Sequence, residues 1–252
     1  MKSLLLSLSL FLFTGFAAAQ TTPVFDDMTE AQTEAFGAAV RDYLLTNPEV
    51  IMEAVAVLEQ RQQQAAAQTD GDLVRRYAED LFYDGYSFIE GNPDGQILMV
   101  EFIDYKCSFC KRAHPDVKAL LEANDDIRLV IKEFPILGAE STLASRAAIS
   151  VLINDGNDAY YNFYDAVMTF NGPLNEATLT RMATESGADA ELMMETVNSP
   201  LVTQMIQTNM RLAQNMQITG TPTFVLGGQM MRGYVPLAQM QIMVDDLRAT
   251  LE

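Results

Sequence analysis

The chain has two cysteines, Cys107 and Cys110, and they are separated by only two residues. A C-x-x-C pair that follows an apolar strand and opens a helix is typical of a redox-active dithiol. Residues 97–103 are apolar and rich in strand formers, and the residues after Cys110 have a helical pattern. Because free N–H groups at a helix start favour a thiolate, we expect Cys107 to be the nucleophile. Cys110, one turn further on, is predicted to be the resolving thiol.

Other uses of the two sulfurs fit the sequence less well. Structural zinc takes four ligands, and the chain offers no further cysteine and a single histidine, His114. A structural disulfide across so short a loop would remove little entropy from the unfolded chain. Capture of Cu(I) stays open, because thiolates and the thioethers of the fifteen methionines suit that ion. We therefore expect thiol–disulfide exchange without a cofactor or a resident metal, and copper binding is the alternative.

The first nineteen residues have the pattern of a secretory signal. A positive start at Lys2 precedes an apolar stretch that ends at Phe13, and Ala17–Ala19 offer a cleavage site. The sequence therefore predicts a signal peptide over 1–19 and a periplasmic protein, placed where disulfides form and persist.

The composition is strongly acidic. The chain has 34 Asp and Glu against 16 Lys and Arg, which gives a net charge of −18. Such a surface repels phosphate backbones and anionic lipid, so we expect no nucleic-acid partner.

Residues 20–85 are predicted to form a helical arm. Thr29 and Gln32 match a capping box for a first helix, and Asn47-Pro48-Glu49 matches the start of a second. Thr69-Asp70-Gly71-Asp72 is predicted to interrupt this second helix before the helical pattern resumes.

The second helix of the arm has an apolar stripe at helical spacing, formed by Ile51, Ala54, Val55 and Leu58. A helix rich in glutamine and alanine buries little surface against its own chain. We therefore expect homo-oligomerisation through residues 29–82, with the number of subunits open. Packing of the arm on its own domain is the alternative.

Residues 86–252 are predicted to form a compact α/β domain. Strands are expected at 86–89, 97–103, 127–134, 223–226 and 230–233. The two strands on either side of the C-x-x-C helix form a βαβ unit, whose strands pair in parallel by default. The segment from about 138 to 216 is helical throughout and interrupts the sheet. Gly227-Gly228 predicts a hairpin between the last two strands.

These features resemble the DsbA family of thioredoxin-fold oxidoreductases. The C-x-x-C ends a strand and opens a helix, and Pro115 matches the kink proline of that helix. Thr221-Pro222 resembles the cis-proline loop of the family, and the helical block lies between the two halves of the sheet. The resemblance implies a thioredoxin fold with a helical insertion, preceded by the N-terminal arm.

The arm resembles that of ScsC-like members of the family. The residues that carry this likeness are Arg41, 47–51, Leu58-Glu59 and, in the compact domain, 133–138. ScsC-like proteins with such an arm can oligomerise through it and can isomerise disulfides.

The resemblance implies roles for residues around the dithiol. Glu101 matches the buried acid that passes a proton to or from the resolving cysteine; a solvated glutamate at the sheet edge is the alternative. Lys132, on the neighbouring strand, is a candidate partner for Glu101. Pro222 is expected in cis, with the backbone of Thr221 beside the sulfurs and ready to pair with substrate. Ser108 and Phe109, between the cysteines, are expected to tune the dithiol and to contact substrate.

Together these observations predict a periplasmic thiol–disulfide oxidoreductase. The arm favours isomerase or reductase work on exported proteins with cysteines, because several dithiols around one cleft can hold a misfolded client. A monomeric, DsbA-like oxidase is the alternative within the class. A membrane redox partner is expected, and no residue identifies it.

Overall fold

The computed structural model describes residues 28–251, so the predicted signal over 1–19 lies outside the described residues. Contacts divide the chain after Arg61 into two compact units. The helices are α1 Glu30–Thr46, α2 Glu49–Arg76, α3 Ala78–Phe82, α4 Ser108–Ala123, α5 Ala139–Asp155, α6 Asn157–Thr169, α7 Glu176–Glu185, α8 Ala190–Thr196, α9 Pro200–Asn215 and α10 Leu237–Ala249. The strands are β1 Phe88–Gly91, β2 Ile97–Ile103, β3 Ile127–Glu133, β4 Thr223–Leu226 and β5 Gln229–Arg232.

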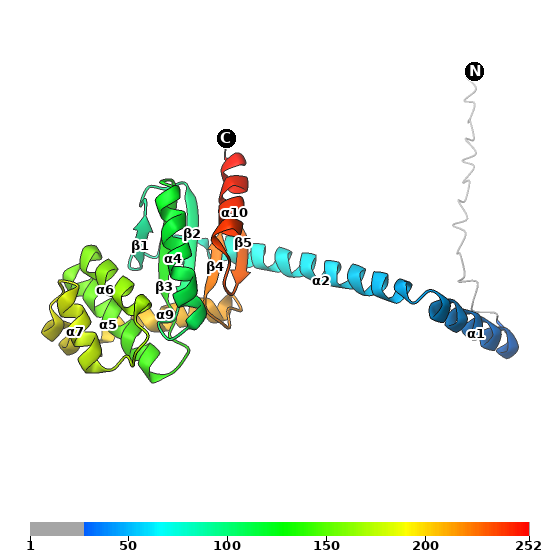
Figure 1. Ribbon diagram of the computed structural model, residues 1–252, viewed down its shortest axis with the longest axis horizontal. Helices are drawn as coiled ribbons and strands as arrows, with labels where there is room; N and C mark the ends of the chain where they lie inside the picture. The colour runs from blue at the N-terminus through cyan, green and yellow to red at the C-terminus, as the bar shows by residue number, and fades with distance from the viewer. Residues whose placement is uncertain (1–27, 252) are drawn as a thin grey trace, which may run out of the picture. The chain divides into compact units, whose positions relative to one another are not determined.

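The second unit is built around a sheet with the strand order β1-β3-β2-β4-β5. Strands β2 and β3 pair in parallel on either side of α4, as the βαβ pattern predicts. The pairs β1–β3, β2–β4 and β4–β5 are antiparallel. Helices α5 to α9 lie in the chain between β3 and β4 (Figure 1). This is the thioredoxin-like α/β fold with a helical insertion, preceded by a helical segment.

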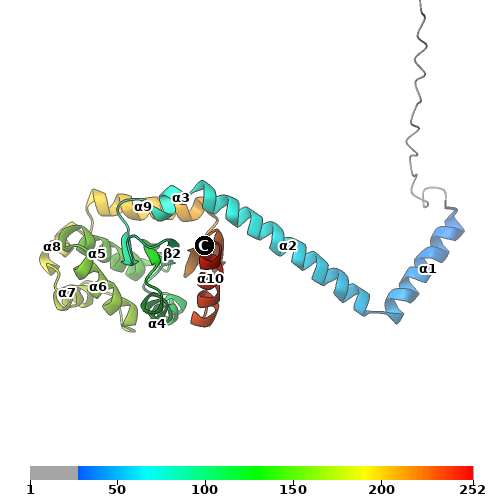
Figure 2. The same ribbon diagram turned by 90° about the horizontal axis from the view of Figure 1, so that it is seen from above.

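The central strands are buried on both faces of the sheet. Helices α4 and α10 lie on one side of it, and α3 and α9 lie on the other (Figure 2). Residues of β2 alternate between the two cores, so that Met99 and Ile103 face α4, whereas Val100 and Phe102 face α3. Glu101 is two residues from Met99 and two from Ile103 along β2, so its side chain points to the same face of the sheet as theirs. It therefore lies on the face that α4 covers.

The predicted interruption of the arm helix at 69–72 is wrong. Helix α2 runs without a break from Glu49 to Arg76, and Asp70 and Gly71 within it are buried. The carboxylate of Asp70 forms two hydrogen bonds with the guanidinium of Arg232, at 2.6 and 2.8 Å. These tertiary contacts stabilise the helix where the local sequence favours a turn.

The first unit consists of α1 and the start of α2. Thr29 and Gln32 form the predicted capping box at the start of α1. None of the residues from 28 to 61 is buried. Within the described part of the chain, no helix combines the length and the apolar character needed to cross a bilayer.

Candidate active site

Cys107 caps the N-terminus of α4. Its backbone is extended, with φ −74° and ψ 115°, and its Sγ accepts a hydrogen bond from the N–H of Cys110 at 3.4 Å. The sulfur thus takes the place of the side-chain oxygen of an ordinary N-cap residue. The positive end of the helix dipole stabilises negative charge at this position.

The pKa of Cys107 is lowered to about 5. The largest cause is a hydrogen bond from the side chain of Cys110, which lowers the pKa. Partial burial acts in the opposite direction and raises it. Hydrogen bonds with Thr221 and with the N–H groups at the helix start lower the pKa further. An ordinary cysteine has a pKa of about 8.5. The sulfur of Cys107 is therefore a thiolate at neutral pH.

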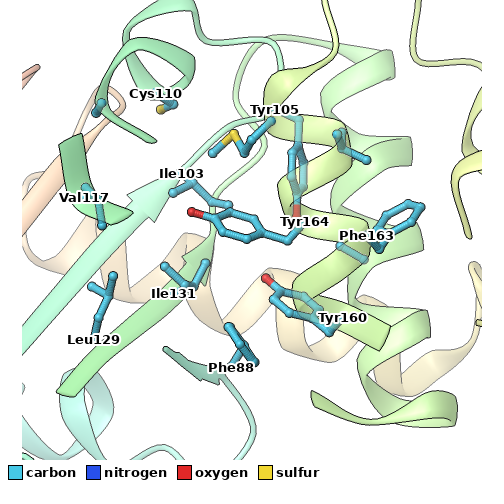
Figure 3. Packing of buried hydrophobic residues seen from close by; sticks show 14 of the residues in the cluster. Phe88, Ile103, Tyr105, Cys110, Val117, Leu129, Ile131, Tyr160, Phe163 and Tyr164 are labelled. Atoms are coloured by element: carbon cyan, nitrogen blue, oxygen red, sulfur yellow. The ribbon is translucent and has the colours of Figure 1, made fainter. Parts of the chain in front are cut away.

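Cys110 has the opposite properties. It is fully buried in the core beneath α4 (Figure 3). Burial raises the pKa of its thiol far above the usual value, and the hydrogen bond to Cys107 and the charge of Glu101 raise it further. The two thiols thus differ in pKa, as an attacking and a resolving thiol must, and of the two residues only Cys107, at 6%, has any exposed surface.

The loop before β4 lies directly beside the attacking sulfur. The Thr221–Pro222 peptide bond is cis, as the resemblance implies. The Sγ of Cys107 lies 3.1 Å from the carbonyl oxygen of Thr221, to which it donates a hydrogen bond in its protonated form. The carbonyl oxygen of Pro222 accepts the N–H of Gly233 at 2.8 Å, which holds the loop against β5.

The two residues between the cysteines lie on the surface. Ser108 is exposed, and 55% of Phe109 is accessible to solvent. Leu137, on the loop after β3, is another exposed apolar residue. Exposed apolar side chains suit contact with an unfolded or extended protein segment.

Glu101 lies in the core, which excludes the alternative of a solvated edge glutamate. The residue has no exposed surface, and neither carboxyl oxygen has a hydrogen-bond partner among the described residues. Burial raises its pKa well above the usual value, and the charges of Glu90 and Cys107 act in the same direction. The carboxyl group is therefore protonated well above the pH at which an exposed glutamate ionises.

The predicted pairing of Lys132 with Glu101 is wrong. In the β2–β3 register, Lys132 lies opposite Phe102, so its side chain is on the other face of the sheet. Its Nζ donates to the Oδ2 of Asp84 at 2.5 Å and to the carbonyl oxygen of Asp80 at 2.7 Å.

Glu101→Gln should change how stability depends on pH. The folded-state pKa of Glu101 is raised, so at low pH the buried carboxyl group is neutral and its burial requires no buried charge. As pH rises above the pKa of Glu101 in the unfolded chain, the unfolded state gains a charge that the folded state resists, and the fold becomes less stable. The variant should therefore match the wild type at about pH 4 and melt at a higher temperature at about pH 8. Thermal unfolding across this pH range measures the difference. An equal offset at every pH would contradict the assignment.

Asp104 contributes to the site and was not predicted. It is fully buried at the end of β2, and its carboxyl group accepts N–H groups of Lys106, Ile136 and Leu137 at 2.7 to 2.9 Å. Its carbonyl oxygen accepts the N–H of Cys107 at 3.0 Å. Asp104 thus connects two loops by hydrogen bonds: the loop before α4, which contains Cys107, and the loop after β3. The signal in the sequence was an aspartate directly after a buried strand and three residues before the first cysteine.

A thioredoxin-like fold with this helix-capping C-x-x-C and an adjacent cis-proline loop defines a thiol–disulfide oxidoreductase. Residues 99–244 match the model of the DSBA-like thioredoxin domain, and residues 32–65 match that of the copper resistance protein ScsC N-terminal domain. The first match covers more than half of the chain, and the chain belongs to the DsbA-like thioredoxin-domain family.

Solved structures of similar proteins agree with this assignment. A thioredoxin-like oxidoreductase from Silicibacter pomeroyi DSS-3 is 38% identical, with a TM-score of 0.64 over 68% of this chain and 97% of that one. ScsC of Proteus mirabilis in a transitional conformation is 28% identical, with a TM-score of 0.66 over 88% of this chain and all of that one. The second match extends into the arm.

This chain also resembles curated proteins, but it matches them over only part of their own length. A Na(+)/H(+) antiporter NhaA of Herminiimonas arsenicoxydans is 29% identical over 148 residues, which are 58% of this chain. The chain spans 23% of the length of that relative.

Proposed function

We propose that the protein is a periplasmic thiol–disulfide isomerase or reductase that acts on exported proteins as a homo-oligomer. The observation that carries the proposal is the acid-shifted thiol of Cys107, which caps α4 beside the Thr221–Pro222 loop. Residues 1–19, as a signal peptide, would direct export. A membrane redox partner would set the resting state of the dithiol.

Each site residue has a role in this proposal. The thiolate of Cys107 attacks a substrate disulfide and forms a mixed disulfide, which Cys110 resolves. Glu101 exchanges a proton with Cys110. The Thr221–Pro222 loop pairs with the backbone of the substrate, and Ser108 and Phe109 contact its side chains.

The choice of isomerase over oxidase depends on the arm. Ile51, Val55 and Leu58 follow one another at helical spacing on α2 and are 41% to 55% exposed. Apolar residues of α1, among them Tyr43 and Leu45, are 58% and 65% exposed. Helices with so much exposed apolar surface gain most of their stability from packing against a partner. The ScsC-like character of residues 32–65 supports a second copy of this chain as that partner.

Replacing Ile51, Val55 and Leu58 with glutamine should dissociate the oligomer and remove isomerase activity. Glutamine keeps the helix propensity and removes the apolar stripe. Light scattering measures the mass, and reactivation of scrambled ribonuclease measures isomerisation. A control variant with Glu53→Gln and Gln60→Ala changes exposed polar residues of the same helix and should keep both properties.

The rate of alkylation of the Cys107 thiol should be unchanged in the glutamine variant. The loss of isomerase activity would then result from loss of the oligomer and not from a change in the reactivity of the thiol. A full-length protein that is monomeric, or a glutamine variant that isomerises as well as the wild type, would contradict the assigned role of the arm. A monomer that oxidises reduced substrates at the wild-type rate would support the oxidase instead.

A further inference from the structure

The surface around the dithiol is basic, although the chain as a whole has a net charge of −18. Lys106 directly precedes Cys107, and two further cations directly follow Cys110. These two are Lys111, which is partly buried, and Arg112, which is exposed, as is Lys106. We call Lys106, Lys111 and Arg112 the basic rim. The function described so far gives the basic rim no role.

The segments that meet at the dithiol contain no Asp or Glu. They are residues 105–115, which contain the two cysteines; 217–222, which contact Cys107; 134–139, which Asp104 binds; and 166–171, which Lys111 binds. The rest of the chain supplies all 34 acidic residues. The positive charge is therefore a local property of the surface around the dithiol.

Acidic residues that adjoin the basic rim have partners of their own. The Nζ of Lys106 lies 2.8 Å from the Oε2 of Glu140. Asp104 is fully buried, and the N–H groups that its carboxyl group accepts stabilise its charge inside the protein. Because Glu140 compensates part of the charge of Lys106, most of the excess positive charge belongs to Lys111 and Arg112.

Lys111 is bound by uncharged groups. Its Nζ donates to the carbonyl oxygen of Val167 at 3.3 Å and to that of Phe170, both at the end of α6. Neither Lys111 nor Arg112 forms a salt bridge with any residue that the structure describes. Their charges are thus available to a carboxylate from outside the chain.

Arg112 is held in place beside the cis-proline loop. Its Cζ lies 4.6 Å from the centre of the Tyr234 ring, and the hydroxyl of Tyr234 donates to the Oδ2 of Asp116 at 2.6 Å. Tyr234 directly follows Gly233, whose N–H binds the carbonyl oxygen of Pro222. Arg112 therefore lies on the side of α4 where the cis-proline loop would pair with a substrate.

An arginine in this setting is suited to bind a carboxylate. A guanidinium that lies on an aromatic ring keeps its N–H groups free at its edge, where they match the two oxygens of a carboxylate. Hydrogen bonds and burial account for the pKa of Cys107, so the basic rim is not needed to form the thiolate. Phe109, next to it on the surface, is 55% exposed, and binding surfaces combine such aromatic residues with arginine.

We propose that Arg112, assisted by the charges of Lys106 and Lys111, selects substrates that have a carboxylate close to the reacting cysteine. The proposal rests on the proposed function of the dithiol and names its substrate class: segments of exported proteins with Asp or Glu beside a cysteine. The net charge of the chain repels such segments at long range, but salt at about 0.1 M screens charges beyond about 10 Å. The basic rim then dominates at contact distance.

Two alkylating reagents of similar size test the basic rim without a protein substrate. Iodoacetate carries a carboxylate and iodoacetamide is neutral. Both react with the Cys107 thiolate of the reduced, full-length protein, so the ratio of their rates does not depend on the pKa of the thiol. In Arg112→Gln we expect the iodoacetate-to-iodoacetamide ratio to fall about two- to fivefold, the effect of one exposed ion pair. Arg112→Glu should lower it further, and Arg112→Lys should keep most of it.

Disulfide-linked peptides test the substrate class. Three peptides differ only in the residues beside the cysteine, which are glutamate, glutamine or lysine. With the wild type, kcat/KM for exchange should be highest for the glutamate peptide and lowest for the lysine peptide. Salt at about 1 M, where the Debye length is about 3 Å, should weaken this order. Arg112→Gln should remove most of the preference, and Arg112→Glu should reverse it.

Arg211→Gln is the matched control. Arg211 is an exposed arginine of α9, which covers the face of the sheet opposite to α4 (Figure 2). This variant changes the net charge of the chain by the same amount as Arg112→Gln. It should leave the reagent ratio and the order of the peptides unchanged. An equal effect of the two variants would contradict the proposal, because net charge rather than position would then decide the preference.

Three further results would overturn the selection of acidic substrates by Arg112. The first is equal kcat/KM for the three peptides with the wild type, and the second is an unchanged reagent ratio in Arg112→Gln. The third is an equal loss for all three peptides in Arg112→Gln, which would indicate a packing role against Tyr234 instead of a charge. Failure of all three peptides to exchange with the wild type would contradict the proposed function of the dithiol, and with it the substrate class.

Discussion

Cys110→Ser should turn a transient intermediate into a stable product, a mixed disulfide between Cys107 and the substrate. In the wild type, Cys107 is the thiolate at neutral pH, with a pKa of about 5, and Cys110 is buried and protonated. The variant keeps the attacking sulfur and removes the sulfur that releases the substrate. Turnover should fall to the uncatalysed rate, and intact mass spectrometry should show substrate bound at position 107.

Cys107→Ser is the paired variant and should form no adduct. With the attacking sulfur gone, the remaining thiol has no exposed surface and a pKa far above neutrality. Both variants should lose all turnover, but only Cys110→Ser should trap substrate. Adducts on Cys110 in the Cys107→Ser variant at a similar rate would contradict the division of roles.

Lys132→Met should destabilise the fold by about 3–5 kcal/mol, the range for breaking a buried ion pair from one side. Lys132 is fully buried, and Asp84, its partner at 2.5 Å, has a side chain that is 8% exposed. Methionine matches the apolar stem and leaves the Asp84 carboxylate without its counter-charge. Urea unfolding at neutral pH measures the loss.

Two further variants test whether loss of the buried Lys132–Asp84 pair causes the loss of stability. Arg181→Met removes the exposed Arg181–Glu185 pair, whose loss should cost at most about 1 kcal/mol. Lys132→Met combined with Asp84→Asn removes both charges and should recover much of the stability. An equal loss in the Lys132→Met and Arg181→Met variants would contradict this account.

The pH dependence of stability has a definite sign at this pair. Burial opposes ionisation of Asp84, but the charge and hydrogen bond of Lys132 outweigh it and lower the pKa of the carboxyl group. Stability from Asp84 is therefore present above its unfolded pKa of about 4 and is lost as pH falls through the lower folded value. Burial also lowers the pKa of Lys132, so the pair stabilises less than its short distance implies.

The architecture around the dithiol could be predicted because local signals agreed there. A short apolar run, a C-x-x-C and a helical pattern place Cys107 at a strand–helix junction without any knowledge of the rest of the fold. The cis bond before Pro222 was different. Most X-Pro bonds are trans, so it could be expected only from the resemblance to the DsbA family.

Features that depend on distant contacts could not be read from local sequence. The segment around Gly71 has the composition of a turn, but it is helical because Asp70 binds Arg232, 162 residues away. The partner of Lys132 depends on the β2–β3 register. That register places Lys132 opposite Phe102 rather than Glu101, so the two charged residues lie on opposite faces.

The residues near Cys110 illustrate the same limit. His114 is the single histidine of the chain and had no evident ligand set, and nothing in the sequence paired it with Tyr164. Their contact joins α6 to α4 across 50 residues of sequence. Only the packing of the helical insertion on the C-x-x-C helix brings them together.

The most direct test measures the rate at which iodoacetamide alkylates Cys107 as a function of pH in the reduced, full-length protein. The geometry at the start of α4 predicts a half-maximal rate near pH 5, with Cys110 unmodified throughout. A midpoint near pH 8.5, where an ordinary cysteine ionises, would mean that the helix start does not hold this sulfur as a thiolate. That result would contradict the chemistry proposed for the protein.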